Sequence, residues 1–314
     1  MTRRRRAARI VVAAAVGVAL ALSGCAAAEP TPTQEPVDVS PPPAPAVTTT
    51  TFAITSDYGG CDEGAQDVAA MVTSWNPAII ATAGDNSQGV AGCTPFTASV
   101  GDLYGSFIHG PDGPRFFPSP GNHDYEDEGA GEDVYLEYFS YLRAITDTPL
   151  WYRVEVGNAN LFLIDSETSE EQLEVQREWL QTSLEEASAD PDTWNIVVFH
   201  RPPYTSGPHE PNTEMSPEAG WDYAGWGADV VVTGHQHVFE SLEVDGLPYI
   251  VAGVGATSLI RPCPEQLVPE SDGCLEGIGA LHVTTTGDAL TFEYRVPDGG
   301  AGRTVETVEV SRDG

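Results

Sequence analysis

Polar residues that can bind metal ions follow five separate apolar stretches of the chain. They are Asp57, Asp85, Asn122 with His123 and Asp124, His200, and His235 with His237. Each apolar stretch has the length of a buried strand, and parallel strands of one sheet end at a common edge. We therefore expect the carboxylates, imidazoles and amide oxygen to converge on one rim. Such a group is typical of a hydrolytic centre that holds two metal ions.

Two cations held close together need a shared anion, which offsets much of their mutual repulsion. Asp57 and Asp85 are the candidates, because both end buried apolar runs where an unpaired carboxylate would be costly. On an extended strand the rings of His235 and His237 would point the same way, so a tight turn there could aim them at adjacent ions.

Alternating strand and helix patterns from Phe52 to about Arg312 must position these residues. Apolar spacing predicts helices over about 61–75, 97–108, 132–145 and 169–189. Strands are expected before the polar residues, with a hairpin around Gly157-Asn158, antiparallel strands after Phe239 and an irregular loop over 201–220. The expected fold is α/β, a four-layer α/β/β/α sandwich of two mixed sheets flanked by helices.

The N-terminal segment has the pattern of a secretory signal, with five arginines ahead of the apolar run Ile10–Leu22. This run is shorter than the ~20 residues that a membrane-spanning helix needs. It ends in Leu22-Ser23-Gly24-Cys25, which resembles a bacterial lipoprotein signal whose cysteine carries lipid; an ordinary signal with an incidental cysteine is the alternative. The predicted parts are a signal peptide (1–24), a proline- and threonine-rich tether (25–51) and a folded domain (52–314).

The chain is strongly acidic, with 47 acidic residues, 14 arginines, no lysine and a formal net charge of -33. Removal of residues 1–24 with their five arginines would change that charge to -38. Such a surface repels nucleic acid and offers no basic stripe that could follow its phosphates. Nucleic-acid binding is therefore disfavoured, and no protein partner is implied.

Four cysteines follow Cys25, an even number that suits an oxidising compartment. Of the three possible pairings we favour Cys61 with Cys93, because each lies a few residues beyond a predicted ligand-bearing strand, and Cys263 with Cys274, which would close a short loop. The rival interpretation, a cysteine-rich zinc site, lacks any paired C-x-x-C spacing.

Five ordered motifs resemble those of the calcineurin-like metallophosphoesterase superfamily. They are Asp57-Tyr58-Gly59, Gly84-Asp85-Asn86, Gly121-Asn122-His123-Asp124, Val198-Phe199-His200 and Gly234-His235-Gln236-His237. The first motif is Asp-x-Gly rather than Asp-x-His, which makes the chain most similar to the purple-acid-phosphatase branch. The resemblance covers about Phe52 to Gly255.

The resemblance implies two metal ions, which could be iron, zinc or manganese. It implies one ion bound by Asp57, Asp85 and His237, and a second bound by Asp85, Asn122, His200 and His235. It also implies that His123 faces the substrate phosphoryl group with Asp124 orienting its ring, and that His209 protonates the leaving oxygen.

One position departs from the branch, which normally has a tyrosine three residues after the bridging aspartate. This chain has Gln88 there. Gln88 could ligate through its carbonyl oxygen or leave the place to water, and either lowers the preference for a trivalent ion. The charge-transfer colour that a tyrosine ligand gives should then be absent.

The implied function is a phosphatase lipid-anchored through Cys25 to the outer face of the cytoplasmic membrane. Two cations would lower the pKa of a bridging water, and the resulting hydroxide would attack the phosphorus of a phosphomonoester in line. A phosphodiesterase or nucleotidase with the same centre is the near alternative. The second alternative is a surface lipoprotein that uses this fold only for binding and has no catalytic activity.

Overall fold

The computed structural model describes residues 49–90, 92–126 and 131–312. The predicted signal peptide, Cys25 and most of the predicted tether lie outside these residues. The first strand begins at Thr50, inside the range that the sequence assigned to the tether. Among the described residues, none of the helices combines the length and the apolar character needed to cross a bilayer.

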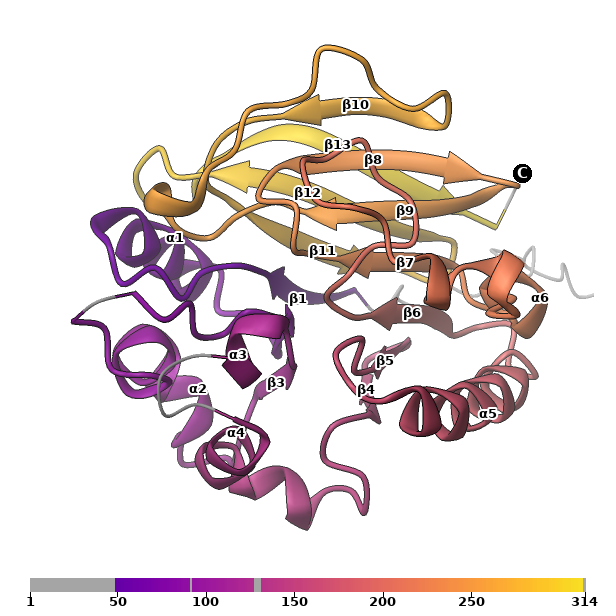
Figure 1. The fold of residues 1–314 in the computed structure, drawn as a ribbon, viewed down its shortest axis with the longest axis horizontal. Helices are drawn as coiled ribbons and strands as arrows, with labels where there is room; N and C mark the ends of the chain where they lie inside the picture. Colours follow the sequence, from indigo (N-terminus) through magenta and orange to yellow (C-terminus); the bar gives the residue numbers. More distant parts are fainter. Residues whose placement is uncertain (1–48, 91, 127–130, 313–314) are drawn as a thin grey trace, which may run out of the picture. The chain divides into compact units, whose positions relative to one another are not determined.

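Two mixed β-sheets form the centre of the domain (Figure 1). The first sheet has the strand order β13-β12-β11-β1-β2-β3, and the second has the order β10-β8-β9-β7-β6-β5-β4. Strands β1, β2 and β3 are parallel, as are β5, β6, β7 and β9. Parallel strands end at one edge, so the segments that follow them meet there.

The strands of the first sheet are β1 Thr50–Thr55, β2 Ile80–Ala83, β3 Phe116–Ser119, β11 Ala280–Thr285, β12 Ala289–Val296 and β13 Arg303–Ser311. Those of the second are β4 Tyr152–Val156, β5 Ala159–Leu163, β6 Trp194–Val198, β7 Val230–Thr233, β8 Phe239–Val244, β9 Leu247–Ala252 and β10 Ser271–Leu275. The α-helices are α1 Glu63–Ser74, α2 Asp102–Ile108, α3 Asn122–Glu126, α4 Glu132–Tyr138, α5 Glu170–Ala187 and α6 Tyr223–Trp226.

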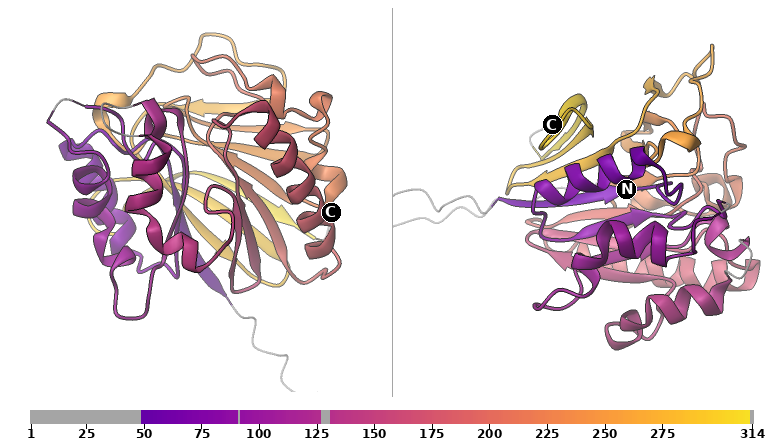
Figure 2. Two further views of the ribbon diagram at one scale, coloured as in Figure 1. Left: turned by 60° about the horizontal axis from the view of Figure 1, so that its bottom comes forward. Right: turned by 90° about the vertical axis from the view of Figure 1, so that its left-hand side faces the viewer.

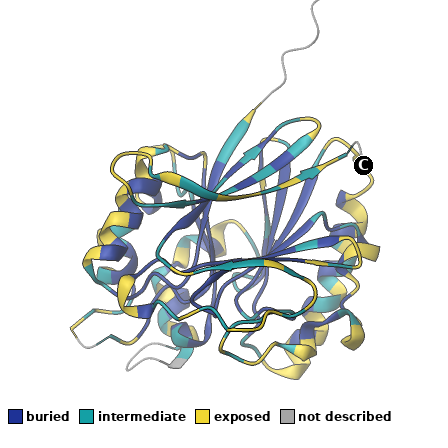
Figure 3. Cartoon of the chain, turned by 90° about the horizontal axis from the view of Figure 1, so that it is seen from above, coloured by how far each residue is buried: buried dark blue, intermediate teal, exposed yellow. Residues whose placement is uncertain are grey.

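Apolar side chains from both sheets share one core. Ile80 and Phe116 of the first sheet belong to the same buried cluster as Leu161 and Ile196 of the second. Helix α5 packs on the other face of the second sheet, where its leucines join Phe162 in a separate cluster. Helices α1 and α2 contact the first sheet. The helices α1 to α4 and the helix α5 thus lie at opposite sides (Figure 2), with buried strands between them (Figure 3). This arrangement confirms the predicted four-layer α/β/β/α sandwich.

The helix starts follow from local capping. Asp62 accepts a hydrogen bond from the N–H of Ala65 at the start of α1, and Ser169 accepts from Gln172 at the start of α5, as the capping pattern predicts. The predicted helix over 97–108 is a π-helical turn, Thr97–Gly101, continued by α2. The one over 132–145 is α4 followed by the 3₁₀ turn Ser140–Ala144.

The remaining local predictions concern loops and cysteines. Strands β4 and β5 form the predicted hairpin. Residues 201–220 form an irregular loop that contains two 3₁₀ turns, Thr213–Met215 and Pro217–Ala219. Another 3₁₀ turn spans Thr257–Leu259. Both predicted disulfides are confirmed: Cys61 with Cys93, which joins the segments that follow β1 and β2, and Cys263 with Cys274.

Candidate active site

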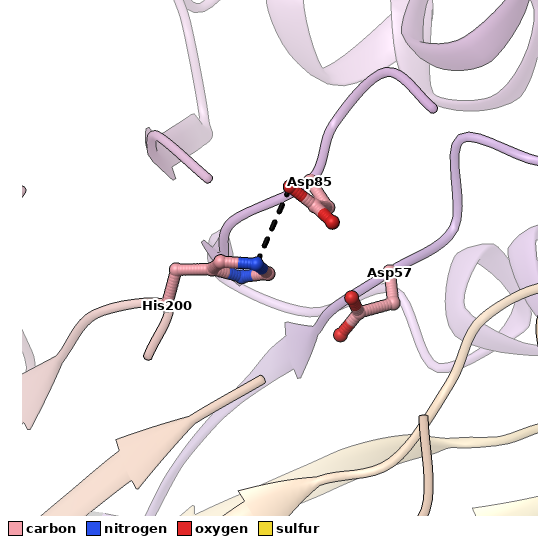
Figure 4. A group of neighbouring side chains, drawn as sticks. All are labelled: Asp57, Asp85 and His200. Carbon is pink, nitrogen blue, oxygen red and sulfur yellow. Dashed lines mark ion pairs between the residues drawn. The ribbon is translucent and has the colours of Figure 1, made fainter. Parts of the chain in front are cut away.

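The first sheet supplies two fully buried carboxylates. Asp57 follows β1 and Asp85 follows β2. Their φ angles are 50° and 52°, so the chain turns through the left-handed region where each strand ends. Such backbone conformations persist where surrounding structure enforces them, and they cluster at functional sites. Ligand atoms of Asp57, Asp85 and His200 lie within 4.8 Å of one another, which is close enough to hold a metal ion (Figure 4).

Asp57 is held by neighbours that leave one of its oxygens available. Its Oδ2 accepts hydrogen bonds from the Ser56 hydroxyl and from the N–H of His235 at 2.9 Å. Its Oδ1 faces Nε2 of His237 at 3.2 Å, yet it has no aligned hydrogen-bond donor among the described residues. Burial would raise the pKa of Asp57, but the charges of His237 and His200 hold it well below its usual range. A buried, ionised oxygen without a donor suits a cation.

Two histidines of the second sheet are oriented by backbone carbonyls. Nδ1 of His200 lies 2.9 Å from the Ala83 oxygen, and Nδ1 of His237 lies 2.8 Å from the Leu259 oxygen. A carbonyl only accepts, so each Nδ1 carries a hydrogen and the opposite nitrogen, Nε2, faces the carboxylates. This is the arrangement that fixes imidazoles as metal ligands in proteins.

The carboxylates attract positive charge to these rings. Burial would lower the pKa of His200, but the charge and hydrogen bond of Asp85, with the charge of Asp57, raise it to about 10. Burial likewise opposes the raised pKa of His237, whose charge Asp57 stabilises. Protons on the imidazoles and metal ions therefore compete for the same lone pairs.

His235 lies between another imidazole and an arginine. Its Nδ1 is 3.2 Å from Nε2 of His200, and its Nε2 is 3.1 Å from Nη1 of Arg201. Burial, then the charges of His200 and Arg201, lower the pKa of His235 to about 2, so the ring is neutral. His235 and His237 have φ angles of 71° and 57° and lie in the turn between β7 and β8. The predicted tight turn is therefore present.

Asn122 reaches the centre from the start of α3, because the chain turns into a helix two residues after β3 ends. Its Oδ1 is 3.2 Å from Nε2 of His200. The loop passes so close to Asp85 that a Cβ atom at Gly121 would collide with the Asp85 backbone nitrogen. Only glycine allows this approach of the two loops.

His123 and Asp124 take different positions in the site. His123 lines the cavity, and its N–H donates to Oδ1 of Asp85 at 3.0 Å. Asp124 is fully buried and accepts hydrogen bonds from the backbone of Gly121 at 2.8 Å and of Ser87 at 2.9 Å. Burial, with the charge of Asp85, raises the pKa of Asp124 to about 7. Asp124 thus joins the loops after β2 and β3. Its implied role in orienting the His123 ring stays a prediction.

Gln88 lies beside Asp85. Its Nε2 donates to Oδ2 of Asp85 at 2.8 Å, so the amide nitrogen, rather than the oxygen, faces the aspartate. In this orientation the Gln88 amide donates a hydrogen bond to Asp85, and its oxygen is not the atom that faces the carboxylate. Its role as a metal ligand stays a prediction.

His209 is held over the site by a residue that sequence reasoning missed. Its ring centroid lies 4.5 Å from that of His235 and 5.8 Å from that of His237. The buried Gln236 side chain accepts from the N–H of His209 at 2.9 Å and donates to its carbonyl at 3.0 Å. The position of Gln236 between two candidate ligand histidines, His235 and His237, was a signal that could have indicated this role.

A second residue whose role sequence reasoning missed is Asn86, which follows Asp85. Its Oδ1 accepts from Tyr58 and Thr82, both at 2.7 Å, and its Nδ2 donates to Asp124 at 2.8 Å. All four residues are buried. Asn86 therefore fixes the loop after β2 through a fully used amide, which sequence spacing alone does not reveal.

These residues surround a cavity of about 540 Å³. It is lined by Asp85, Gln88, Asn122, His123, Arg201, His209, Glu210, His235, His237, Leu259 and Arg261. The size is within the range of protein sites for small molecules, about 300–1,000 Å³. Nitrogen and oxygen atoms that can bind metal ions and two arginines line this cavity together, a combination that suits an anionic substrate.

The family model described as calcineurin-like phosphoesterase matches residues 50–239. Purple acid phosphatase 18 of Arabidopsis thaliana is 30% identical over 128 residues, which are 38% of this chain and 29% of that relative. The chain thus matches less than a third of the length of this relative.

Two solved structures share the fold. A purple acid phosphatase from yellow lupin seeds, Lupinus luteus, has a TM-score of 0.63 and 16% identity, over 84% of this chain and 54% of that chain. GAP50, the anchor in the inner membrane complex of Plasmodium, has a TM-score of 0.64 and 17% identity, over 84% of this chain and 89% of that chain. At these identities the similarity shows the fold alone.

Proposed function

Because the chain belongs to the calcineurin-like phosphoesterase family, we propose that it is a binuclear-metal phosphatase that hydrolyses phosphomonoesters outside the cytoplasm. The observation that carries this proposal is the convergence of carboxylates and imidazoles from two sheets on one cavity. Bound there, two metal ions would supply an activated water for in-line attack on phosphorus and would neutralise phosphate oxygens.

The residues fit two cations. Asp57 and His237 form one side with Asp85, and Oδ1 of Asp57 lies 3.2 Å from Nε2 of His237. A metal ion there would replace the proton between these two atoms. On the other side, Nε2 of His200 is 3.3 Å from Oδ1 of Asp85 and 3.2 Å from Oδ1 of Asn122. Asp85 lies between the two sides and would be the shared carboxylate. A mixed nitrogen and oxygen set suits zinc, iron or manganese.

The other side chains of the cavity would bind substrate and move protons. His123 would contact the phosphoryl group, since it lines the cavity next to Asn122. His209, held by Gln236, would give a proton to the leaving oxygen. Asp124 would keep the loops after β2 and β3 in register, so that Asp85 and Asn122 stay together.

The proposed location rests on the two disulfides, which suit an oxidising compartment. We propose in addition that Cys25 carries lipid, which would anchor the domain to the outer face of the cytoplasmic membrane. Labelling with a radioactive fatty acid tests the anchor. Label in the wild type but not in Cys25→Ala would support it, and equal label in both would contradict it.

The activity is tested with p-nitrophenyl phosphate and its bis ester, after reconstitution with zinc, iron or manganese. We expect faster hydrolysis of the monoester and loss of activity after chelation. Preference for the bis ester would favour the phosphodiesterase alternative. If metal-loaded protein hydrolysed neither ester, the proposed activity would be contradicted. The alternative that the domain serves only for binding would then be favoured.

A further inference from the structure

Arg261 lines the cavity as a fixed cation that pairs with no carboxylate in the part of the chain that the structure describes. Its Nη1 donates to the carbonyls of Leu259 at 3.0 Å and Ile260 at 3.3 Å. Its backbone N–H donates to the His237 oxygen at 3.2 Å. These bonds hold the residue in place without neutralising its charge, in a chain whose formal net charge is -33.

The second arginine of the cavity is different. Nε of Arg201 lies 2.8 Å and 3.0 Å from the two carboxylate oxygens of Glu167, which is largely buried. Its Nη1 contacts His235. Arg201 is thus neutralised and sits beside a candidate metal ligand. Arg261 keeps its charge available for another anion.

The position of Arg261 indicates which part of a substrate it would meet. The Leu259 carbonyl binds both Nη1 of Arg261 and Nδ1 of His237, so Arg261 lies on the His237 side of the centre. The His209 ring centroid lies 5.8 Å from that of His237, and His209 and Arg261 line the same cavity. His209 is the proposed proton donor to the leaving oxygen. Arg261 is therefore on the leaving-group side.

The cavity has room for more than a phosphoryl group. Its volume of about 540 Å³ is that of a site for a whole small molecule. Glu210, an exposed residue, also lines it and would repel an anion. Arg261 and Glu210 therefore act in opposite directions on an anionic group in this cavity.

We propose that Arg261 is a specificity residue, and that the preferred substrates are phosphomonoesters whose alcohol carries a second anionic group, a carboxylate or a phosphate. The inference rests on the proposed function, which puts the transferred phosphoryl group at the candidate metal ligands. The planar guanidinium can bind either anion through two parallel hydrogen bonds.

The direct test is calorimetric binding of phosphonates, which cannot be hydrolysed, to the metal-loaded full chain. The probes are 4-phosphonobutanoate, butane-1,4-bisphosphonate and the neutral-ended 4-phosphonobutanamide. We expect at least one anion-ended probe to bind about tenfold tighter than the amide, as a charged hydrogen bond allows. The two anionic probes distinguish a carboxylate from a phosphate.

Variants then assign the preference to one side chain. Arg261→Gln should bring the ratio of affinities close to one, and Arg261→Lys should keep part of it. Glu210→Gln should increase the ratio. Arg303→Gln removes the same charge from the exposed strand β13 and should leave the ratio as in the wild type. Equal binding of all three probes by the wild type, or a preference that survives in Arg261→Gln, would overturn the proposal.

Hydrolysis of the corresponding phosphate esters separates this inference from the proposed function. Turnover without a preference for anion-ended esters would contradict the role of Arg261, and the proposed phosphatase activity would still stand. If the protein preferred anion-ended phosphonates but hydrolysed no ester, the proposed phosphatase activity would be contradicted. The proposed recognition of anions by Arg261 would still stand.

Discussion

The two sheets contribute different chemistry to the candidate centre. The loops after β1, β2 and β3 supply oxygen atoms from Asp57, Asp85 and Asn122. The segments after β6 and β7 supply imidazole nitrogens from His200, His235 and His237. We refer to these as the oxygen half and the nitrogen half.

The halves are also held in place differently. The oxygen half is tied together by its own loops, through Asp124, which binds Gly121 and Ser87, and through the disulfide of Cys61 with Cys93. In the nitrogen half, the His200 ring is oriented by the Ala83 carbonyl, which belongs to the first sheet. Asp85 and Asn122 of the oxygen half are therefore positioned by loops of one sheet, whereas the orientation of His200 depends on how the two sheets pack. The N–H of His235, which donates to Asp57, is a second contact between the halves.

The largest expected effect comes from removing the ligand that the proposed ions share. Asp85→Ala should lose both ions and lower phosphatase activity by about 1,000-fold or more, which is a barrier increase of about 4 kcal/mol. His237→Ala removes a ligand from one side only and should keep a tighter-bound fraction of the metal. Metal analysis and kcat/KM of both variants measure the contrast. Normal turnover of Asp85→Ala would refute the shared-carboxylate scheme.

A smaller effect is expected for the cavity side chain that binds no metal in the proposed scheme. His123→Ala should keep the bound metal and lower kcat by about 100-fold, the contribution of one positioned hydrogen-bond donor to the charge of the transition state. Steady-state kinetics with parallel metal analysis tests this. Loss of metal in His123→Ala would place this residue among the ligands.

Next is the support that the nitrogen half gives to His209. Gln236→Leu removes both hydrogen bonds to the His209 backbone and should lower kcat by about tenfold, as losses of supporting residues commonly do. The loss should grow with the pKa of the leaving alcohol, because a poor leaving group needs the proton more. A loss that is equal for all leaving groups would mean that Gln236 acts only on the fold.

The smallest effect concerns a contact between loops of the two sheets, where Tyr125 after β3 donates to Oδ2 of Asp165 after β5 at 2.8 Å. Burial raises the pKa of Asp165 from 3.8 to about 7. Between about pH 4 and 7 the native state keeps a proton that the unfolded chain has lost, so stability falls as the pH rises through this range.

Asp165→Asn should remove this contribution and flatten the pH dependence of Tm between pH 5 and 7. Each kcal/mol corresponds to roughly 2–4 °C in a domain of this size. Thermal unfolding with a chelator present measures the change. An unchanged slope would show that Asp165 titrates near its ordinary pKa.

The sequence predicted the oxygen half and the nitrogen half because apolar runs that end in polar residues mark strand ends. The same reasoning placed the hairpin and both disulfides. It missed Asn86, Gln236 and Arg261, whose roles depend on contacts between loops. A buried amide that binds another loop has no spacing that identifies it.

Two further differences have physical causes. The helices expected over 97–108 and 132–145 are interrupted by π and 3₁₀ turns, because tertiary packing of Phe96 against Tyr135 and Phe139 overrides a regular helical pattern. The sequence also did not predict that Asp124 joins two loops, a role that follows from the several N–H donors that its buried carboxylate needs.

The measurement that tests the central claim most directly is elemental analysis of purified protein after dialysis against zinc, iron or manganese. If the oxygen half and the nitrogen half share one pair of cations, about two transition-metal ions per chain should remain bound in the wild type. Protein that is folded and disulfide-bonded yet retains none would contradict the proposed metal centre.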